Sequence, residues 1–153
     1  MLRLERVIRR RVHQQYQSRL FGNRHPQRAS TNVSIFPSGS LIPKLLAPEG
    51  IECEVIDLRT VQPLDIATVI SSARRTNRVV VVHEAVRFGG LGGEIAAQVQ
   101  EYAFDYLDGP VTRVAAPFSP VPFSPVLESR YIPDAARIAE GIRDCLGLQP
   151  ANG

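Results

Sequence analysis

Residues 78–99 of the chain read RVVVVHEAVRFGGLGGEIAAQV, and this stretch decides the fold. Four consecutive valines, Val79 to Val82, form a β-branched run without polar alternation, which predicts a strand buried on both faces. His83 and Glu84 follow the run, so we expect the strand to end there. Ligands and partners of open α/β sheets meet the carboxyl ends of the strands. These two polar side chains are therefore candidate interface residues.

A glycine-rich loop follows the predicted strand, with Gly89, Gly90, Gly92 and Gly93 inside five residues. The loop lacks the third glycine of the dinucleotide-binding pattern, because position 95 is isoleucine, and it lacks the Gly-Lys-Ser/Thr ending of a phosphate-binding P-loop. These departures favour a loop that packs closely or meets a partner. The alternative is a stand-alone regulatory module, in which backbone N–H groups at the next helix start bind an anion or nucleotide.

The rest of the chain alternates short strands and amphipathic helices. The further predicted strands are residues 33–36, 51–58 and 111–115, and the predicted helices are residues 41–46, 64–77, 94–106 and 133–146. Four prolines within residues 117–125 predict a stiff, extended segment that cannot pair as a central strand. It is either a surface crossover or a rigid edge that meets another subunit. The order predicts a three-layer α/β fold with a mostly parallel sheet of about four or five strands.

Composition limits the class of protein. A chain of 153 residues with 44% hydrophobic residues can form one domain with a real core. No apolar run reaches the roughly 18 residues that cross a membrane. Cys53 and Cys145 lack the spacing of a disulfide framework, so we expect two reduced, buried thiols. The three histidines lie far apart in the sequence, so no metal site is expected.

The charge is concentrated at the N-terminus, where residues 1–32 contain eight arginines and a single acid, Glu5. We expect a basic, flexible leader at 1–32, a folded domain at 33–148 and a short tail at 149–153. The leader has three possible interpretations: a solvated segment without a function, an amphipathic targeting segment of mitochondrial type, or a basic arm for nucleic acid. No nucleic-acid-binding motif accompanies the arginines, so nucleic acid is not an expected partner.

Catalytic residues are hard to find in this sequence. His83 and Glu84 are adjacent, and adjacent side chains on a strand point to opposite faces, so they do not form a dyad by strand geometry alone. We expect His83 either to cap the strand and bind a loop carbonyl or to make a titratable contact at a subunit interface. No nucleophile elbow of the Gly-x-Ser-x-Gly kind occurs. The sequence therefore predicts no catalytic residue.

Four ordered segments carry a resemblance to a known family. They are VIDLRTVQPLD at 55–65, VVHEA at 81–85, GGLGGEIA at 89–96 and PVPFSPVLE at 120–128. In this order and spacing they resemble the C-terminal domain of the beta subunit of thiamine-dependent 2-oxo acid dehydrogenases, which act on pyruvate or branched-chain 2-oxo acids. That domain belongs to the transketolase C-terminal family. The resemblance covers about residues 33–148 and implies the three-layer fold described above.

The resemblance also implies a function in assembly. In the family, other domains hold thiamine diphosphate and Mg²⁺, so we expect this chain, truncated or split, to bind neither alone and to be inactive alone. The implied partners are the alpha and beta subunits of a 2-oxo acid dehydrogenase and the binding domain of the acyltransferase core. The implied location is the cytoplasm, or the mitochondrial matrix in a eukaryote. Candidate docking residues for a basic partner are Glu101, Asp105 and Asp108, although a solvated helix face is the alternative interpretation.

Two departures from the family pattern stand out in the sequence. The helix predicted at 41–46 is shorter than its counterpart in the family, which would leave one face of the sheet less covered and favour association with a partner. Phe118 stands where the family commonly has an aspartate. Any contact that this aspartate makes in the family is therefore not expected in this chain.

Overall fold

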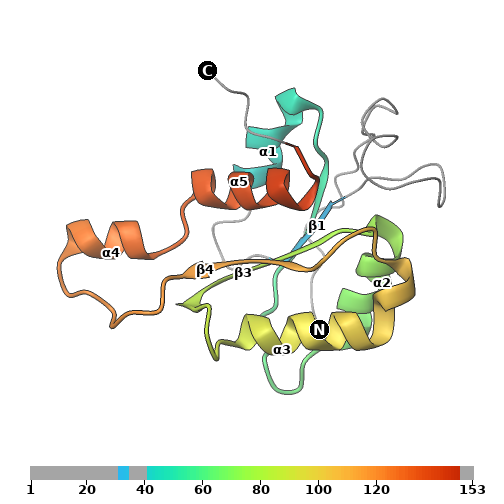
Figure 1. Ribbon diagram of the computed structural model, residues 1–153, viewed down its shortest axis with the longest axis horizontal. Coiled ribbons are helices and arrows are strands. Elements are labelled where there is room, and N and C mark those ends of the chain that lie inside the picture. Colours follow the sequence, from blue (N-terminus) through green and yellow to red (C-terminus); the bar gives the residue numbers. More distant parts are fainter. Residues whose placement is uncertain (1–30, 35–40, 149–153) are drawn as a thin grey trace.

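The computed structural model describes residues 31–34 and 41–148, which form a sheet between two helical layers (Figure 1). The strands are β1 (Thr31–Ser34), β2 (Cys53–Ile56), β3 (Val79–Val86) and β4 (Thr112–Ala116). The helices are α1 (Ile42–Leu46), α2 (Ile66–Thr76), α3 (Leu91–Ala103), α4 (Pro125–Tyr131) and α5 (Ala135–Cys145). Two short 3-10 turns, η2 (Ala47–Glu49) and η3 (Phe104–Tyr106), extend α1 and α3.

The sheet has the order β2-β1-β3-β4, and every pairing is parallel. The backbone of Val33 in β1 lies opposite Val55 in β2 and Val80 in β3, so β1 is a central strand. Parallel neighbours require crossover connections, and helices supply them here. The expected α/β architecture is thus confirmed, with four parallel strands in the described part of the chain.

The valine run contributes side chains to both hydrophobic layers, as predicted. Val80 and Val82 face the layer formed with α1 and α5, whereas Val79 and Val81 face the layer formed with α2 and α3. All four valines are buried. Because side chains alternate along a strand, one continuous apolar run serves two cores.

The helix ends follow from short-range sequence signals. Asp65 caps α2, where its carboxylate accepts hydrogen bonds from the Thr68 backbone N–H at 3.1 Å and the Thr68 hydroxyl at 2.7 Å. These hydrogen bonds lower the pKa of Asp65. Asn77 ends α2 in the left-handed conformation, with φ at 62°. Asp134 caps α5 by accepting a hydrogen bond from the Arg137 N–H at 2.8 Å, so the last helix begins at Ala135, two residues later than predicted.

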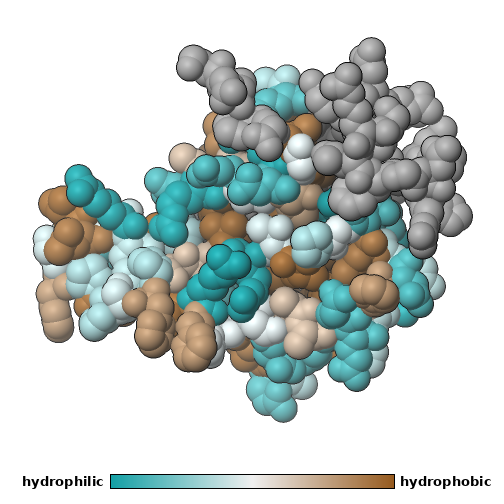
Figure 2. Space-filling view, viewed as in Figure 1, coloured by the Kyte–Doolittle hydropathy of each residue, from teal (hydrophilic) through white to brown (hydrophobic). Residues whose placement is uncertain are grey.

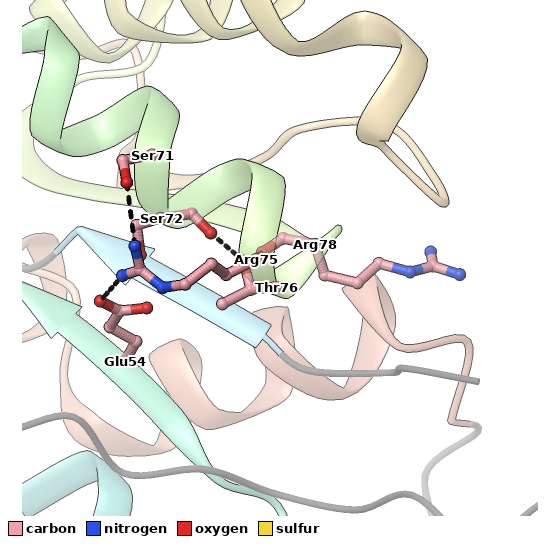
Figure 3. Close-up of polar contacts among 6 residues, drawn as sticks. All are labelled: Glu54, Ser71, Ser72, Arg75, Thr76 and Arg78. Atoms are coloured by element: carbon pink, nitrogen blue, oxygen red, sulfur yellow. Dashed lines mark hydrogen bonds and ion pairs between the residues drawn. The ribbon is translucent and has the colours of Figure 1, made fainter.

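A polar cluster lies between β2 and α2 (Figure 3). Glu54 is only 3% exposed, and its carboxylate pairs with the guanidinium of Arg75. Arg75 also donates to the Ser71 hydroxyl at 3.0 Å, and Thr76 donates to the carbonyl of Ser72 at 3.0 Å. Apolar and polar side chains therefore do alternate in residues 51–58, but α2 covers the polar face of this strand. The ion pair with Arg75 makes the burial of Glu54 tolerable.

The third strand is longer than predicted. It continues through His83 and Glu84 to Val86 instead of ending at the polar pair, and its pairing with β4 is irregular between His83 and Val86. His83 continues the alternation of Val79 and Val81 and is buried toward α3, whereas Glu84 is exposed. The polar side chains of His83 and Glu84 did not mark the end of the strand, because the backbone hydrogen bonds of a strand do not depend on side-chain polarity.

Helix α4 was missed by the sequence prediction, which gave an extended segment at residues 117–125. The segment is indeed without helix up to Ser124, but Pro125 then occupies the first turn of α4. Proline is tolerated at that position because its missing N–H has no partner in a helix anyway. The prolines were therefore correctly interpreted for the first part of the segment and wrongly for its end.

Several predictions fall on residues outside the described ranges. The tail at 149–153, the turn after residue 36 and residues 35 and 36 of the first predicted strand are among them. The leader prediction extended to residue 32, but β1 already begins at Thr31. The rest of the leader lies outside the described residues. Cys53 and Cys145 are both buried, and neither forms a disulfide bond, as expected.

Candidate functional site

His83 and the glycine loop form one packed unit at the carboxyl end of β3. The His83 side chain is only 4% exposed and lies under the start of α3. A Cβ atom at Gly92 would overlap the imidazole ring, and a Cβ atom at Gly90 would come within 2.8 Å of the ring Cε1. At Gly92 the histidine ring occupies the space that a side chain would need, whereas at Gly90 the Val86 carbonyl oxygen, 2.3 Å from the Cβ position, excludes a side chain first and the ring adds to it.

The other two glycines of the loop have different functions. Gly89 adopts a positive φ of 69°, and no atom lies within 4 Å of the position a Cβ would take, so its requirement is conformational. A Cβ at Gly93 would lie 3.3 Å from a guanidinium nitrogen of Arg113, at the end of a flexible side chain. The sequence prediction of a closely packing loop is consistent with this geometry.

The electrostatics of His83 favour the neutral imidazole. Burial lowers the pKa of His83, and the Arg113 guanidinium lowers it further. The Ala85 carbonyl opposes these two effects weakly, but neither ring nitrogen reaches hydrogen-bonding geometry with a described atom. His83 is not at the strand end and makes no hydrogen bond that would cap it, so the capping interpretation is wrong. Its alternative, a titratable contact at a subunit interface, stays a prediction.

Glu84 is separated from His83 by the strand geometry. Its side chain is exposed, while that of His83 is buried under α3. The two residues therefore do not form a catalytic pair in this structure, in agreement with the alternation expected of a strand. Glu84 is left as an exposed carboxylate near the glycine turn.

The acidic candidates lie at the opposite end of α3 from the glycine loop (Figure 1). Glu101 is exposed on α3, Asp105 is exposed in η3, and Asp108 is exposed in the turn that follows. Three exposed aromatic residues, which the sequence interpretation did not single out, alternate with them: Tyr102, Phe104 and Tyr106. We call these six residues the acidic–aromatic surface. The helical spacing of Ile95, Val99 and Tyr102 predicts that Tyr102 lies on the apolar stripe of this helix, but its side chain is 51% exposed.

Hydrogen bonds from α2 hold the acidic–aromatic surface in place. Arg74 donates to the Tyr102 carbonyl at 3.0 Å, and its guanidinium lies 4.9 Å from the centre of the Tyr106 ring. Asn77 donates from its side chain to the Tyr106 carbonyl at 2.5 Å. The turn between α3 and β4 is therefore anchored, which is the condition for presenting a defined surface to a partner.

A second exposed aromatic group lies near the glycine loop. The rings of Phe88 and Phe118 meet edge to face, with centroids 5.2 Å apart and planes at 70°. Both side chains are about three-quarters exposed. Phe118 was noted in the sequence as a departure from the family pattern, but its partner Phe88 was missed, because only the fold brings the two residues together.

The described residues were searched for metal-ligand clusters and for membrane-spanning helices. No three His, Cys, Asp or Glu side chains among them lie close enough together to hold a metal ion. No helix in the described ranges combines the length and apolar character needed to cross a membrane. The features that the described residues do present are a packed histidine–glycine unit and two exposed aromatic surfaces.

Comparison with known proteins places the chain in a family. Residues 40–138 match the model described as transketolase, C-terminal domain. Subunit beta of the acetoin:2,6-dichlorophenolindophenol oxidoreductase of Cupriavidus necator is 43% identical over 129 residues, which cover 80% of this chain and 38% of the relative. The corresponding subunit of Bacillus subtilis is 36% identical over 146 residues, which cover 92% of this chain and 42% of the relative.

Two further proteins are similar to this chain. Subunit beta of the pyruvate dehydrogenase E1 component of Rickettsia felis is 43% identical over 99 residues, which cover 65% of this chain and 30% of the relative. A solved structure described as a split gene transketolase, inactive beta4 tetramer, has a TM-score of 0.61 at 25% identity and covers 79% of this chain and 39% of that one. The chain thus spans less than half the length of these relatives.

The alignments also bear on the leader. The match to the Bacillus subtilis subunit covers a larger share of the chain than residues 33–153 provide, so it includes part of residues 1–32. Similarity to the beta subunits therefore begins earlier than the sequence segments indicated. Together, the family model and the beta-subunit relatives show that this chain belongs to the transketolase C-terminal domain family.

Proposed function

We propose that this chain acts as the C-terminal assembly domain of a 2-oxo acid dehydrogenase beta subunit. Alone, it does not decarboxylate a 2-oxo acid. The observation that carries this proposal is the match of residues 40–138 to a C-terminal domain, with named relatives that are longer beta subunits. The complete enzyme would oxidatively decarboxylate pyruvate or a branched-chain 2-oxo acid. Its substrate choice would be set outside this domain.

The chemistry of the domain supports contact in preference to catalysis. The one histidine among the described residues, His83, is buried under Gly90 and Gly92, and Glu84 is separated from it. We assign no described residue to Mg²⁺, because no suitable cluster of ligands is found among them. Thiamine diphosphate supplies carbanion chemistry when bound to such enzymes. We propose that other domains of the assembled enzyme hold it.

The proposed partners are an alpha subunit and further beta subunits. The solved neighbour is described as an inactive tetramer of beta chains, which supports the idea that a related chain can assemble without being active. Two relatives from Dictyostelium discoideum carry the word mitochondrial in their names. We propose that the chain works in the cytoplasm of a bacterium or in the mitochondrial matrix of a eukaryote.

A third partner is proposed for the acidic–aromatic surface. Three acids and three exposed aromatic side chains suit a docking domain that is basic and partly apolar, such as the binding domain of the acyltransferase core. Charge complementarity would raise the association rate, and the aromatic rings would contribute buried area. The anchoring of this surface by Arg74 and Asn77 supports the proposal.

Reconstitution tests the proposed function. The full chain is co-expressed with an alpha subunit and with the preceding part of a related beta subunit, and decarboxylation of pyruvate and branched-chain 2-oxo acids is followed with dichlorophenolindophenol as electron acceptor. We expect activity only when all three components are present. A complex that lacks this chain and is equally active, or failure of this chain to join the complex, would contradict the assembly role.

Anion binding at the start of α3 is a second candidate function. Gly90 is the N-cap residue of α3 and provides no side-chain cap, Arg113 lies beside Gly93, and the ring nitrogens of buried His83 make no hydrogen bond to described atoms. Titration calorimetry with inorganic phosphate and with nucleotides tests this candidate. Binding that is lost in Arg113→Gln would support it, and the absence of heat at millimolar ligand would remove it.

A further inference from the structure

The imidazole ring of His83 is buried without hydrogen bonds to its nitrogens. The side chain is only 4% exposed, and neither Nδ1 nor Nε2 has a hydrogen-bond partner among the described atoms. A neutral imidazole carries one donor and one acceptor, and a buried polar group without a partner costs free energy. The packed position of the ring is therefore opposed by its own polar atoms, and any movement that lets water reach them removes that cost.

The cover over this ring is made of glycines. Gly90 and Gly92 lie over it so closely that a Cβ atom at either position would come within 2.8 Å of a ring atom. Gly89 precedes them in the left-handed conformation, with φ at 69°. Because glycine populates many backbone conformations, a segment with this composition gains conformational entropy when it leaves the ring.

The contacts that hold this segment lie near the surface. The Arg87 N–H donates to the Ala116 carbonyl at 3.0 Å, and Arg113 donates to the Arg87 carbonyl at 3.3 Å. Residues 84–90 are all at least partly exposed. Segments with exposed backbone hydrogen bonds and little buried apolar area open locally, without unfolding of the whole domain.

The charges around His83 disfavour a proton on the packed ring. Burial lowers the pKa of His83, and the guanidinium of Arg113 on β4 lowers it further. The start of α3, which is the positive end of the helix macrodipole, lies over the ring. Arg87 adds an exposed positive charge in the loop, while Glu84 on β3 and Glu94 on α3 are both exposed carboxylates. A protonated ring would therefore gain free energy by leaving this position.

We propose that the glycine loop and the first turn of α3 form a proton-sensitive latch, which is closed over the neutral ring of His83 and opens when the ring binds a proton. In the open state water reaches both ring nitrogens and the added charge. Because the proton binds the open state in preference to the closed one, a fall in pH shifts the population toward opening. This device goes beyond the assembly role proposed above and does not depend on it.

The latch carries Phe88, whose ring contacts a second part of the molecule. The rings of Phe88 and Phe118 meet with centroids 5.2 Å apart. Phe118 belongs to the segment from Pro117 to Tyr131, which we call the arm and which projects beyond the end of β4 (Figure 1). Figure 2 shows apolar side chains gathered on this projecting part of the molecule. The exposed apolar side chains of the arm, together with Phe88, form what we call the apolar patch: Phe88, Phe118, Val121, Phe123, Val126 and Leu127.

The arm is held at its base by contacts that the latch does not share. Arg137 of α5 donates to the Ala115 carbonyl at 3.1 Å and to the Tyr131 carbonyl at 3.3 Å, and so links the two ends of the arm. Opening of the latch would therefore separate Phe88 from Phe118 and leave the arm in place. The apolar patch would lose one of its members in mild acid.

Amide hydrogen exchange of the full chain, followed by nuclear magnetic resonance at pH 7.5 and 5.5, measures the latch. The reporters are the N–H groups of Arg87 and of Gly93, the latter of which donates to the Gly90 carbonyl at 2.9 Å. We expect their protection, corrected for the intrinsic exchange rate, to fall about tenfold at pH 5.5, because a released ring with a pKa of about 6.5 is then mostly protonated and the packed ring is not. The Asn77 N–H donates to the Ala73 carbonyl at 2.8 Å before the start of β3, and its protection should not change.

The matched variant is His83→Gln, because glutamine has polar atoms but does not titrate. The variant keeps His13 and His25, so any response that originates in those histidines remains in it. We expect the pH response of the Arg87 and Gly93 amides to vanish. The wild type decides the proposal even if this variant does not fold, since the expected response is a difference between two pH values of one molecule.

Phe118→Ala tests the link between the latch and the arm. The Phe118 side chain is about three-quarters exposed, so its replacement leaves the core intact. Loss of the edge-to-face contact with Phe88 should speed up exchange of the Arg87 amide about twofold to tenfold at both pH values, and leave the ratio between the two values unchanged.

Several results would overturn the proposal. Equal protection of the Arg87 and Gly93 amides at both pH values in the wild type would do so, as would an undiminished response in His83→Gln. A response of the Asn77 amide as large as theirs would mean that the whole domain opens. Exchange in Phe118→Ala equal to that of the wild type would overturn the link to the arm. Inactivity of the reconstituted enzyme would leave all these results intact, so the latch and the proposed function can fail separately.

Discussion

The two ends of helix α3 present surfaces of opposite character. At its start, the glycine turn and the arm expose the apolar patch, whose continuous segment 117–127 contains no charge. At its end, the acidic–aromatic surface alternates carboxylates with aromatic rings. An uncharged surface can face its own copy, whereas a surface of one sign repels it and attracts a basic partner. Contacts that need different chemistry can therefore be made at opposite ends of one helix.

The largest effect is expected from a substitution that disrupts the packing of His83 under the start of α3. Gly92→Ala places a Cβ in the space of the His83 ring, and we expect it to lower the free energy of unfolding by about 3 kcal/mol, as overpacking in a core does. Chemical denaturation measures this change. Gly93→Ala is the matched control, because its Cβ meets only the flexible end of Arg113 and alanine favours a helix, so its stability should stay within about 1 kcal/mol of wild type.

A double variant sharpens that result. If the ring of His83 causes the loss, His83→Ala combined with Gly92→Ala should cost less than the sum of the two single variants, because the smaller side chain releases the overlap. Strict additivity of the two changes would contradict the packing explanation for this glycine.

The next effect is a loss of the domain's stability in mild acid, which originates at His83. The folded state lowers the pKa of His83, so the unfolded chain binds a proton more readily and stability falls as the pH drops below about 6.5. The loss cannot exceed about 1.4 kcal/mol per pH unit for a single group. Urea unfolding at pH 7.5 and 5.5 measures it. His83→Leu cannot titrate at this position, and equal losses in wild type and variant would refute the assignment.

A smaller effect is expected on binding of a partner to the acidic–aromatic surface, which should depend on salt and on the charges of this surface. Glu101→Lys with Asp105→Lys should weaken binding of a basic docking domain about tenfold at low salt and leave self-association unchanged. Raising the ionic strength should weaken docking of the wild type but not its dimerisation, because exposed charges are screened and apolar contacts are not. Titration calorimetry and ultracentrifugation provide the two readings. Docking that is independent of salt would argue against a charged recognition surface.

The smallest expected effect concerns the anchor of the acidic–aromatic surface. Arg74→Ala removes the hydrogen bond to Tyr102 and the contact with the Tyr106 ring, and we expect a loss of about 0.5–1 kcal/mol, typical of an exposed cation–π pair. Thermal unfolding measures the loss, and hydrogen exchange should speed up in η3 and nowhere near the arm. Faster exchange in both places would mean that the two ends of α3 are coupled.

The layers of the fold could be predicted from the sequence because they depend on local patterns. The valine run, the alternation in residues 51–58 and the apolar spacing of α5 each indicated an element that the structure contains. Helix α4 could not be predicted in this way, since it has no buried stripe and begins with a proline. The end of β3 was misjudged because His83 is polar, and only its packing under two glycines explains why it is buried.

The candidate site was harder to predict than the fold. The glycines and His83 were each identified as interface or loop candidates, but their mutual packing depends on the return of α3 over β3, which no sequence spacing reveals. Phe88 contacts Phe118, which lies thirty positions later in the chain, and Tyr102 has the spacing of a buried helix position although it is exposed. Exposure of large apolar side chains is a property of the tertiary structure, so a sequence pattern cannot distinguish it from burial.

The two buried cysteines make the molecule convenient for distance spectroscopy. Cys53 and Cys145 are the chain's only thiols, both lie in the layer between the sheet and α1 and α5, and burial raises the pKa of Cys145, which slows its reaction with maleimides and methanethiosulfonates. A single cysteine introduced at exposed Ser124 would therefore take up a spin label without prior removal of the native thiols. Pulsed electron resonance between two labelled copies would then measure the separation of two arms in solution.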